Sequence, residues 1–161
     1  MDEINKFLKK IEEKNILDAN FLGLVKQYLI HNSSSLDEEV MWIVYWDVHF
    51  DNLLVKDSGI SGILDFEWSD IMSIDYVLDL ANRLQNYPTI YASREEDEDN
   101  IQVKDYENIM EYYREFYPEL FTFKNIEKRI ALYSIKYDLR LLLKFPDSES
   151  LKERLLKTLK I

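Results

Sequence analysis

Residues 40–66 read VMWIVYWDVHFDNLLVKDSGISGILDF and contain the segments of the chain that are expected to form strands. It begins with a continuous apolar run of β-branched and aromatic residues, Val40 to Tyr45, which is typical of a buried strand. Asn52 to Val55 and Ile60 to Phe66 predict two more short strands. The turn formers Lys56-Asp57-Ser58-Gly59 stand between them and favour a tight hairpin. The stretch therefore predicts a strand, a loop and a β-hairpin, in that order.

The sequence on either side of this stretch has the periodicity of helices. Before it, apolar residues at helical spacing predict helices over 2–14 and 19–32, the first with Asp2 as its N-cap. After it, a helix is predicted over 76–86, and three more follow between residue 106 and the C-terminus. One stripe, expected to face the core, consists of Ile126, Ile130, Tyr133, Tyr137 and Leu141. We expect one α+β domain over residues 1–161, mainly helical, with the helices segregated from the strands.

The composition excludes several classes of function. The formal net charge of −11 argues against nucleic acid and anionic membranes as partners, because both need Lys and Arg against phosphate. This charge either attracts a cationic small molecule or serves solubility alone. The absence of Cys excludes disulfides, thiolate zinc sites and Cys nucleophiles. No apolar run approaches the roughly 20 residues of a membrane span, and the N-terminus has no signal-peptide core, so we expect a cytoplasmic protein.

Four acidic or amide residues stand at the ends of the predicted strands and helices: Asp47, Asn52, Asp65 and Asp75. The hairpin turn is expected to bring Asn52 and Asp65 together, with Asp47 on the loop beside them. An Asn and an Asp supply oxygen ligands for a hard cation such as Mg²⁺, and a nearby Asp can accept a proton from an attacking hydroxyl. Phosphoryl transfer needs these parts. Each residue alone is also an ordinary turn former or helix cap, so the hypothesis rests on their joint spacing.

The segment WDVHFDNLLVKDSGISGILDFEWSD, followed by IDYVLDLA, resembles the C-terminal lobe signature of the aminoglycoside phosphotransferase and choline kinase-like families. The family pattern is H-x-D-x-H-x-x-N, then a hairpin, then I-D-F/W, then D-P-x-x-D-L-A. The three motifs appear here in this order and at the right intervals. The matching residues are Asp47, His49 and Asn52 for the first motif, Leu64-Asp65-Phe66 for the second, and Asp75, Asp79, Leu80 and Ala81 for the third.

The resemblance implies a protein-kinase-like C-terminal lobe with a short β-hairpin that carries the catalytic and metal residues. It implies Asp47 as the catalytic base and Asn52 and Asp65 as the ligands of Mg²⁺. The implied reaction transfers the γ-phosphate of ATP (or GTP) to a hydroxyl of a small substrate, cationic if it is aminoglycoside- or choline-like. The motifs do not distinguish ATP from GTP or one acceptor from another.

The other matching residues receive supporting roles. His49 holds the loop by hydrogen bonds or, in the alternative, is a metal ligand. Asp75 and Asp79 are expected to organise the catalytic loop and to cap the following helix rather than to touch substrate. Glu67 and Asp70 either bind a cationic substrate, as acidic residues do in aminoglycoside sites, or belong to an ordinary solvated face.

The chain departs from the family pattern in two places. The first His of the pattern falls on Tyr45, and the small residue after it falls on Trp46. The 46 residues before Asp47 read as helices, and none of the three glycines belongs to a glycine-rich loop. We therefore expect the N-terminal nucleotide-binding lobe to be absent and stand-alone kinase activity to be weak or absent. The chain would be a truncated product or half of a split enzyme, completed by a separately encoded N-terminal lobe or self-associating through the exposed lobe interface.

Two other interpretations stay open. In one, the chain is a non-catalytic kinase remnant that binds a cationic ligand or a partner protein through an acidic pocket. In the other, it is a gene fragment without function, which would expose the apolar interface of a lobe cut from its neighbour. Whether the chain is an enzyme therefore depends on which of the three interpretations holds.

Overall fold

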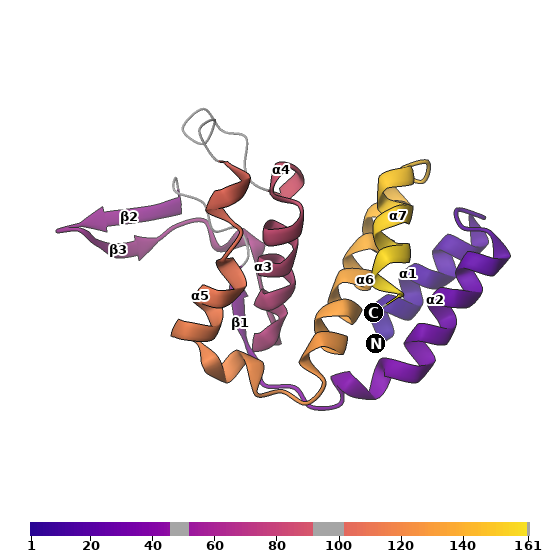
Figure 1. Ribbon diagram of the computed structural model, residues 1–161, viewed down its shortest axis with the longest axis horizontal. Helices are drawn as coiled ribbons and strands as arrows, with labels where there is room; N and C mark the ends of the chain where they lie inside the picture. The colour runs from indigo at the N-terminus through magenta and orange to yellow at the C-terminus, as the bar shows by residue number, and fades with distance from the viewer. Residues whose placement is uncertain (46–51, 92–101, 161) are drawn as a thin grey trace. The chain divides into compact units, whose positions relative to one another are not determined.

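The computed structural model describes residues 1–45, 52–91 and 102–160 (Figure 1). Among these residues helices predominate, accompanied by two small antiparallel sheets, so the predicted mainly helical character is confirmed. The contacts divide the chain into two compact units. The first, Met1–Glu38 with Phe123–Ile161, is called the helical unit below, and the second, Glu39–Thr122, is called the strand unit. The kinase-like lobe and the single domain over 1–161 stay predictions.

The helical unit joins the two ends of the chain. Its described elements are α1 (Asp2–Glu13), α2 (Ala19–Asn32), the 3-10 turn η1 (Ser33–Leu36), α6 (Ile126–Lys144) and α7 (Glu149–Thr158). Both α1 and α7 pack against the long helix α6. The two predicted N-terminal helices are thus confirmed within a residue or two at their ends.

The starts of these helices follow ordinary capping chemistry, with one correction. The Asp18 carboxylate accepts a hydrogen bond from the Phe21 amide at 2.8 Å and so caps α2. The Ser148 hydroxyl accepts one from the Leu151 amide at 3.4 Å and caps α7. The N-cap of α1 is Met1, so the prediction of Asp2 as the cap is wrong. Asp2 is instead in the first turn, where a carboxylate favours the positive end of the helix.

All four helices contribute to one apolar core. Its buried members include Ile4, Leu8 and Ile11 of α1, Leu22, Val25 and Leu29 of α2, Leu132, Ile135, Leu139 and Leu142 of α6, and Leu151 and Leu155 of α7. Of the five residues in the stripe predicted for α6, Tyr133 is buried and the other four are partly buried, Leu141 against this core. The helix has apolar side chains on more than one face, and its packing partners select the face that is buried.

The strand unit contains two separate two-stranded sheets. Strand β1 (Met41–Tyr45) pairs with β4 (Ser69–Ser73), and β2 (Leu53–Lys56) pairs with β3 (Gly59–Ile63). The predicted hairpin is confirmed, whereas β4 was not predicted. Both residues of the hairpin turn have positive φ, 51° at Asp57 and 64° at Ser58. This is the pattern of a type I′ turn, whose twist matches that of the flanking strands.

The remaining elements of the strand unit are short helices. They are the 3-10 turns η3 (Phe66–Trp68) and η4 (Ile74–Tyr76), helices α3 (Val77–Asn86) and α4 (Pro88–Tyr91), the 3-10 turn η6 (Val103–Asp105), helix α5 (Ile109–Phe116) and the 3-10 turn η7 (Pro118–Phe121). Helix α3 packs against α4 and α5. None of the helices in the described parts of the chain is both long and apolar enough to traverse a bilayer.

The prediction that Val40 to Tyr45 forms a buried strand is wrong in its burial. Only Val44 is buried, while Trp42 and Ile43 are 64% and 63% exposed. An apolar run predicts a strand because β-branched and aromatic residues fit a pleated surface. It does not say whether another layer covers that surface. In the described residues, β1 has β4 as its only strand neighbour.

Candidate functional site

The two predicted metal ligands lie at the same end of the β2–β3 ribbon. Asn52 directly precedes β2, and Asp65 follows β3 by two residues. The Leu64 amide donates a hydrogen bond to the Asn52 carbonyl at 2.8 Å, which extends the pairing beyond the strands. Asp65 is the next residue along the chain. The structure therefore brings Asn52 and Asp65 to the end of the ribbon opposite the turn, as the hairpin predicts.

The donor chemistry of this pair fits Mg²⁺. Asn52 is only 8% exposed, whereas the Asp65 side chain is exposed. No group of three or more His, Asp or Glu in the described ranges is placed to hold a metal ion by itself. Mg²⁺ does not need such a cage, because it is usually held by one or two protein oxygens together with substrate phosphates and water. An amide oxygen and a carboxylate suit that role.

The backbone at Asp65 is unusual. Its φ and ψ are 56° and 67°, in the left-handed region. This conformation costs an L-residue roughly 1–2 kcal/mol, although Asp and Asn tolerate it better than most. Asp57, in the turn at the other end of the ribbon, also has a positive φ, 51°. The ribbon thus carries two aspartates of positive φ at opposite ends, which makes Asp57 a matched control for Asp65.

Tyr45 fastens the segment that carries Asp65. Its hydroxyl donates a hydrogen bond to the Leu64 carbonyl at 3.1 Å. Its ring lies 5.3 Å from the ring of Phe66, measured between centroids. Tyr45 occupies the place of the first His in the family pattern. In this chain, the residue at that place therefore connects the end of β1 to both neighbours of Asp65.

Tyr45→Phe should loosen this connection without disturbing the rest of the strand unit. The variant keeps the ring contact and removes one hydrogen bond, which in an exposed setting stabilises by about 0.5–1 kcal/mol. We expect faster amide hydrogen exchange at 64–66 and little change elsewhere. Tyr112→Phe, at another exposed tyrosine of the strand unit, is the control. Equal exchange at 64–66 in both variants would show that Tyr45 does not hold this segment.

Asp75 and Asp79 are buried and act within the protein. Both side chains have no exposed surface. The Ser73 hydroxyl donates to the Asp75 carboxylate at 2.5 Å. The Asp79 carboxylate pairs with the Arg83 guanidinium at 2.8 Å. Neither carboxylate is exposed to solvent, and the prediction that they organise the catalytic loop rather than touch substrate stays a prediction.

One part of that expectation is wrong. The N-cap of α3 is Tyr76, so Asp75 does not occupy the capping position, and Asp79 is inside the first turn. The 3-10 turn η4 leads directly into α3 and displaces the helix start by a residue. Sequence reasoning also missed Arg83 as the partner of Asp79, although their i, i+4 spacing is the ordinary signal for such a pair.

Of the four other predicted site residues, two lie outside the described residues and two are exposed. Asp47 and His49 lie between Tyr45 and Asn52, outside the described residues. Glu67 is in η3 and Asp70 in β4, and both are exposed. The Asp70 carboxylate accepts a hydrogen bond from the Ile71 amide at 2.7 Å. Exposed carboxylates of this kind fit both the substrate-binding and the solvated-face interpretations.

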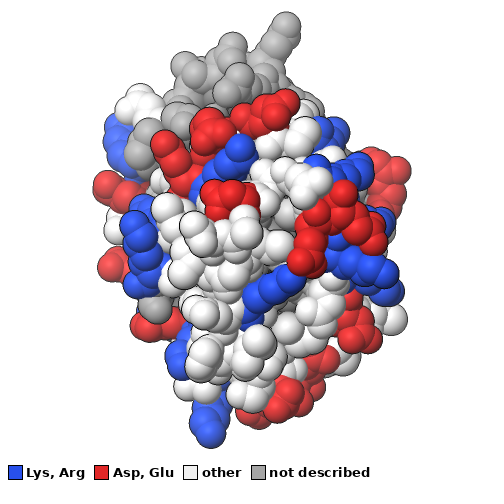
Figure 2. All heavy atoms as spheres, turned by 90° about the vertical axis from the view of Figure 1, so that its right-hand side faces the viewer, with Lys and Arg blue, Asp and Glu red and all other residues white. Residues whose placement is uncertain are grey.

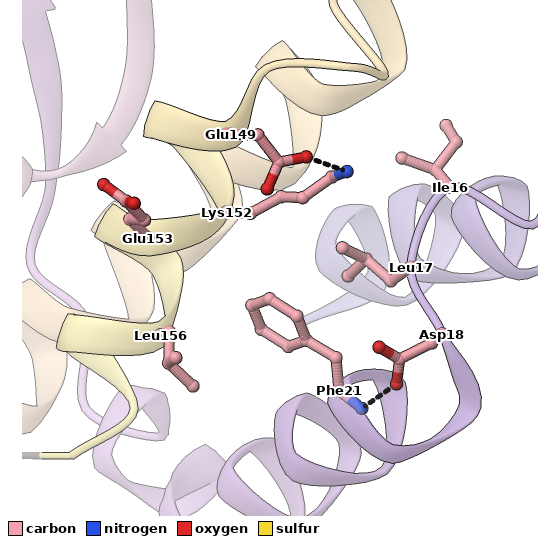
Figure 3. Close-up of a pocket in the computed structure, with 8 residues that line it drawn as sticks. All are labelled: Ile16, Leu17, Asp18, Phe21, Glu149, Lys152, Glu153 and Leu156. Atoms are coloured by element: carbon pink, nitrogen blue, oxygen red, sulfur yellow. Dashed lines mark hydrogen bonds and ion pairs between the residues drawn. The ribbon is translucent and has the colours of Figure 1, made fainter.

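A pocket of about 280 Å³ lies in the helical unit, away from the motif residues in sequence (Figure 3). Ile16, Leu17, Phe21 and Leu156 provide its apolar lining, and Asp18, Glu149, Lys152 and Glu153 its charged lining. Two of these carboxylates are engaged, Asp18 as a helix cap and Glu149 with Lys152 at 2.8 Å. None of the residues predicted for phosphoryl transfer lines it, so this pocket is not the predicted site.

Comparison with known proteins returned no match among family models, curated proteins or solved structures. The resemblance to a phosphotransferase family therefore stays a prediction, which rests on the three motifs in the sequence.

Proposed function

We propose that this chain carries the metal-binding and base-bearing half of a small-molecule phosphotransferase site. The observation that carries the proposal is the placement of Asn52 and Asp65 at one end of the β2–β3 ribbon, with Asp47 five residues before Asn52. Three motifs in the order and spacing of the aminoglycoside phosphotransferase and choline kinase-like families support it. The acceptor is a small hydroxyl compound, and the acidic strand unit favours a cationic one.

Each residue has a defined part in this proposal. The acceptor hydroxyl attacks the γ-phosphorus of ATP (or GTP), the bond to the β–γ bridging oxygen breaks, and Asp47 takes the hydroxyl proton. Asn52 and Asp65 hold Mg²⁺, which neutralises charge on the phosphates when bound. Glu67 and Asp70, exposed close to Asp65 in sequence, attract the cationic part of the acceptor. Asp75 and Asp79 keep the following turn and helix in place from within the protein.

The nucleotide phosphates need a phosphate-binding loop, and the described residues do not contain one. The described residues before Asp47 form α1, α2, η1 and β1, and the three glycines lie in α2 and β3. None of these places is a glycine-rich loop over phosphates. We therefore propose that phosphoryl transfer requires a nucleotide-binding lobe in addition to residues 1–161, and that this chain alone turns ATP over weakly or not at all.

Titration with Mg²⁺ in the presence of ADP tests the metal site directly. Trp68 is three residues from Asp65 and reports binding by its fluorescence. We expect Asp65→Asn to weaken the Mg²⁺-dependent signal by at least about tenfold, or about 1.4 kcal/mol, because a carboxylate ligand is lost. Asp57→Asn makes the same chemical change at the opposite end of the ribbon and should leave the affinity within about twofold. Equal affinities in the two variants would contradict the proposed metal site.

Turnover separates the half-site from a complete enzyme. The chain is incubated with Mg²⁺·ATP and a panel of aminoglycosides and amino alcohols, alongside Asp47→Ala. Robust turnover that depends on Asp47 would overturn the need for an added lobe while supporting the assigned base.

A non-catalytic binding module is the second candidate. The exposed carboxylates of Glu67 and Asp70 favour this candidate, because a cationic ligand can reach them when no nucleotide is bound. Binding of a cationic ligand that persists without Mg²⁺ and survives Asp47→Ala would favour the module over the kinase.

A further inference from the structure

Both ribbons of the strand unit expose apolar side chains that face each other across strands. In the β1–β4 ribbon, Ile43 lies opposite Ile71, and the two are 63% and 66% exposed. In the β2–β3 ribbon, Val55 lies opposite Ile60, and the two are 69% and 65% exposed. Directly opposed β-branched residues pack against each other across the strands, and the apolar face that they form is ordinarily buried against another element. Here the packing surface is present and the described residues leave it uncovered.

The ribbons also offer unpaired backbone. In the described part of the chain, each of the four strands is paired with one neighbour only. A two-stranded ribbon is marginally stable by itself in water, and a strand edge without a partner is a template for another strand. The features that proteins use to block such edges are charges, prolines and bulges.

One of the two edges of the β1–β4 ribbon is partly blocked. The Ile71 amide in β4 already donates to the Asp70 carboxylate at 2.7 Å, so this donor is engaged by the strand's own side chain. The sequence of β1, MWIVY, has no charged residue and no proline. The outer edge of β1 is therefore the better template, and it runs beside the exposed Trp42 and Ile43.

The charge of the strand unit indicates the chemistry of its partner. This unit contains 19 of the 31 acidic residues and 5 of the 20 basic ones, a net charge of −14. The helical unit contains the other 12 acidic and 15 basic residues, a net charge of +3. Figure 2 shows Lys and Arg interspersed with Asp and Glu over the face that it draws. Between residues 39 and 73, seven residues are acidic and only Lys56 is basic.

We infer that the outer edge of β1 binds a basic, strand-forming segment of a partner protein. The segment adds to the ribbon through main-chain hydrogen bonds. Its apolar side chains extend the row that Ile43 and Ile71 form on one face of the ribbon, and its Lys and Arg side chains meet the carboxylate of Glu39. A second copy of this chain is the less favoured occupant, because two strand units of charge −14 repel each other. The inference does not depend on Asp47 acting as a base.

A synthetic peptide of alternating valine and lysine, fluorescently labelled and long enough to span β1, is the probe. Its binding is followed by fluorescence anisotropy at low ionic strength. We expect Ile43→Thr with Ile71→Thr to weaken binding by at least about tenfold, because Thr keeps the strand propensity and removes apolar area. Ile30→Thr is the matched control, since Ile30 is 75% exposed on α2 of the helical unit. It should leave the affinity unchanged.

Two altered peptides separate the parts of the proposal. A glycine–lysine peptide of equal charge and a valine–lysine peptide with N-methylated amides should both bind at least about tenfold more weakly. If the glycine–lysine peptide bound as tightly as the valine–lysine peptide, the interaction would depend on charge alone. If the N-methylated peptide bound as tightly, strand addition would be excluded.

Sedimentation velocity provides the last test. A dimer that the Ile43→Thr and Ile71→Thr changes dissociate would show that a second copy covers this edge and would overturn the proposal. Unchanged circular dichroism of the variants confirms that they fold.

Discussion

Asp138→Ala should lower the free energy of unfolding of the helical unit by about 3–5 kcal/mol. Asp138 in α6 and Arg154 in α7 are 1% and 9% exposed. The Arg154 Nε donates to both carboxylate oxygens at 3.1 and 3.2 Å, and its Nη2 forms a further bond to Oδ1. Removing the carboxylate leaves a buried guanidinium without its charged partner. Leaving a buried charge unpaired lowers the free energy of unfolding by far more than the intact ion pair contributes to it.

Urea unfolding followed by far-UV circular dichroism measures this effect. All three Trp residues lie in the strand unit, so Trp fluorescence reports that unit separately. Glu12→Ala is the control, because Glu12 pairs with Lys26 at 2.7 Å on the exposed surface. We expect it to cost less than about 1 kcal/mol. The double change Asp138→Leu with Arg154→Met should recover much of the lost stability, since no buried charge then remains. A cost for Asp138→Ala as small as that of Glu12→Ala would contradict the argument.

Arg129→Leu should destabilise the helical unit by a comparable amount, about 3–5 kcal/mol. Arg129 has no exposed surface, and its Nη1 donates to the Ser35 carbonyl at 2.5 Å and to the Glu38 carbonyl at 2.6 Å. Its guanidinium also lies 4.6 Å from the centre of the Phe123 ring. Removing a donor from a buried carbonyl costs about 1–3 kcal/mol, and the lost cation–π contact adds about 0.5–2 kcal/mol.

Arg129→Lys distinguishes charge from geometry at this position. Lysine keeps the positive charge and much of the apolar stem, but it lacks the second nitrogen, Nη2, which donates to the Tyr133 hydroxyl at 3.0 Å, and the planar group that lies beside the Phe123 ring. We expect its cost to lie between those of the wild type and Arg129→Leu, measured by the same circular dichroism signal. Equal stability of Arg129→Lys and the wild type would show that the charge alone matters. A loss below about 1 kcal/mol for Arg129→Leu would show that the carbonyls find other donors.

Local chemistry explains why much of the site was predictable. The hairpin follows from two apolar runs separated by Lys56-Asp57-Ser58-Gly59, and it occurs where the turn formers predict it. Once the hairpin exists, Asn52 and Asp65 lie at the same end of it, because antiparallel pairing sets Asn52 opposite Leu64, the residue next to Asp65. The functional roles of these residues, and that of Asp47, remain proposals that rest on the motifs.

Long-range contacts explain what was missed. Strand β4, SDIMS, has little apolar character and forms because β1 offers it an edge. The partner of Arg129 at Ser35 lies 94 residues earlier, and no local pattern indicates such a contact. The role of Tyr45 was missed for the same reason, since its bond to Leu64 spans 19 residues.

Periodicity and turn chemistry in the sequence predict the main helices, the strands other than β4, the position of the hairpin turn, and the presence of Asn52 and Asp65 at the end of the hairpin. Those features depend on periodicity, turn chemistry and spacing over a few residues, all of which are local. Tertiary packing sets which apolar faces are covered, so α6 buries residues beyond the predicted stripe, and most of VMWIVY apart from Val44 is exposed. Whether an apolar face is buried depends on which surfaces from distant parts of the chain pack against it. A linear pattern of hydrophobicity does not contain that information.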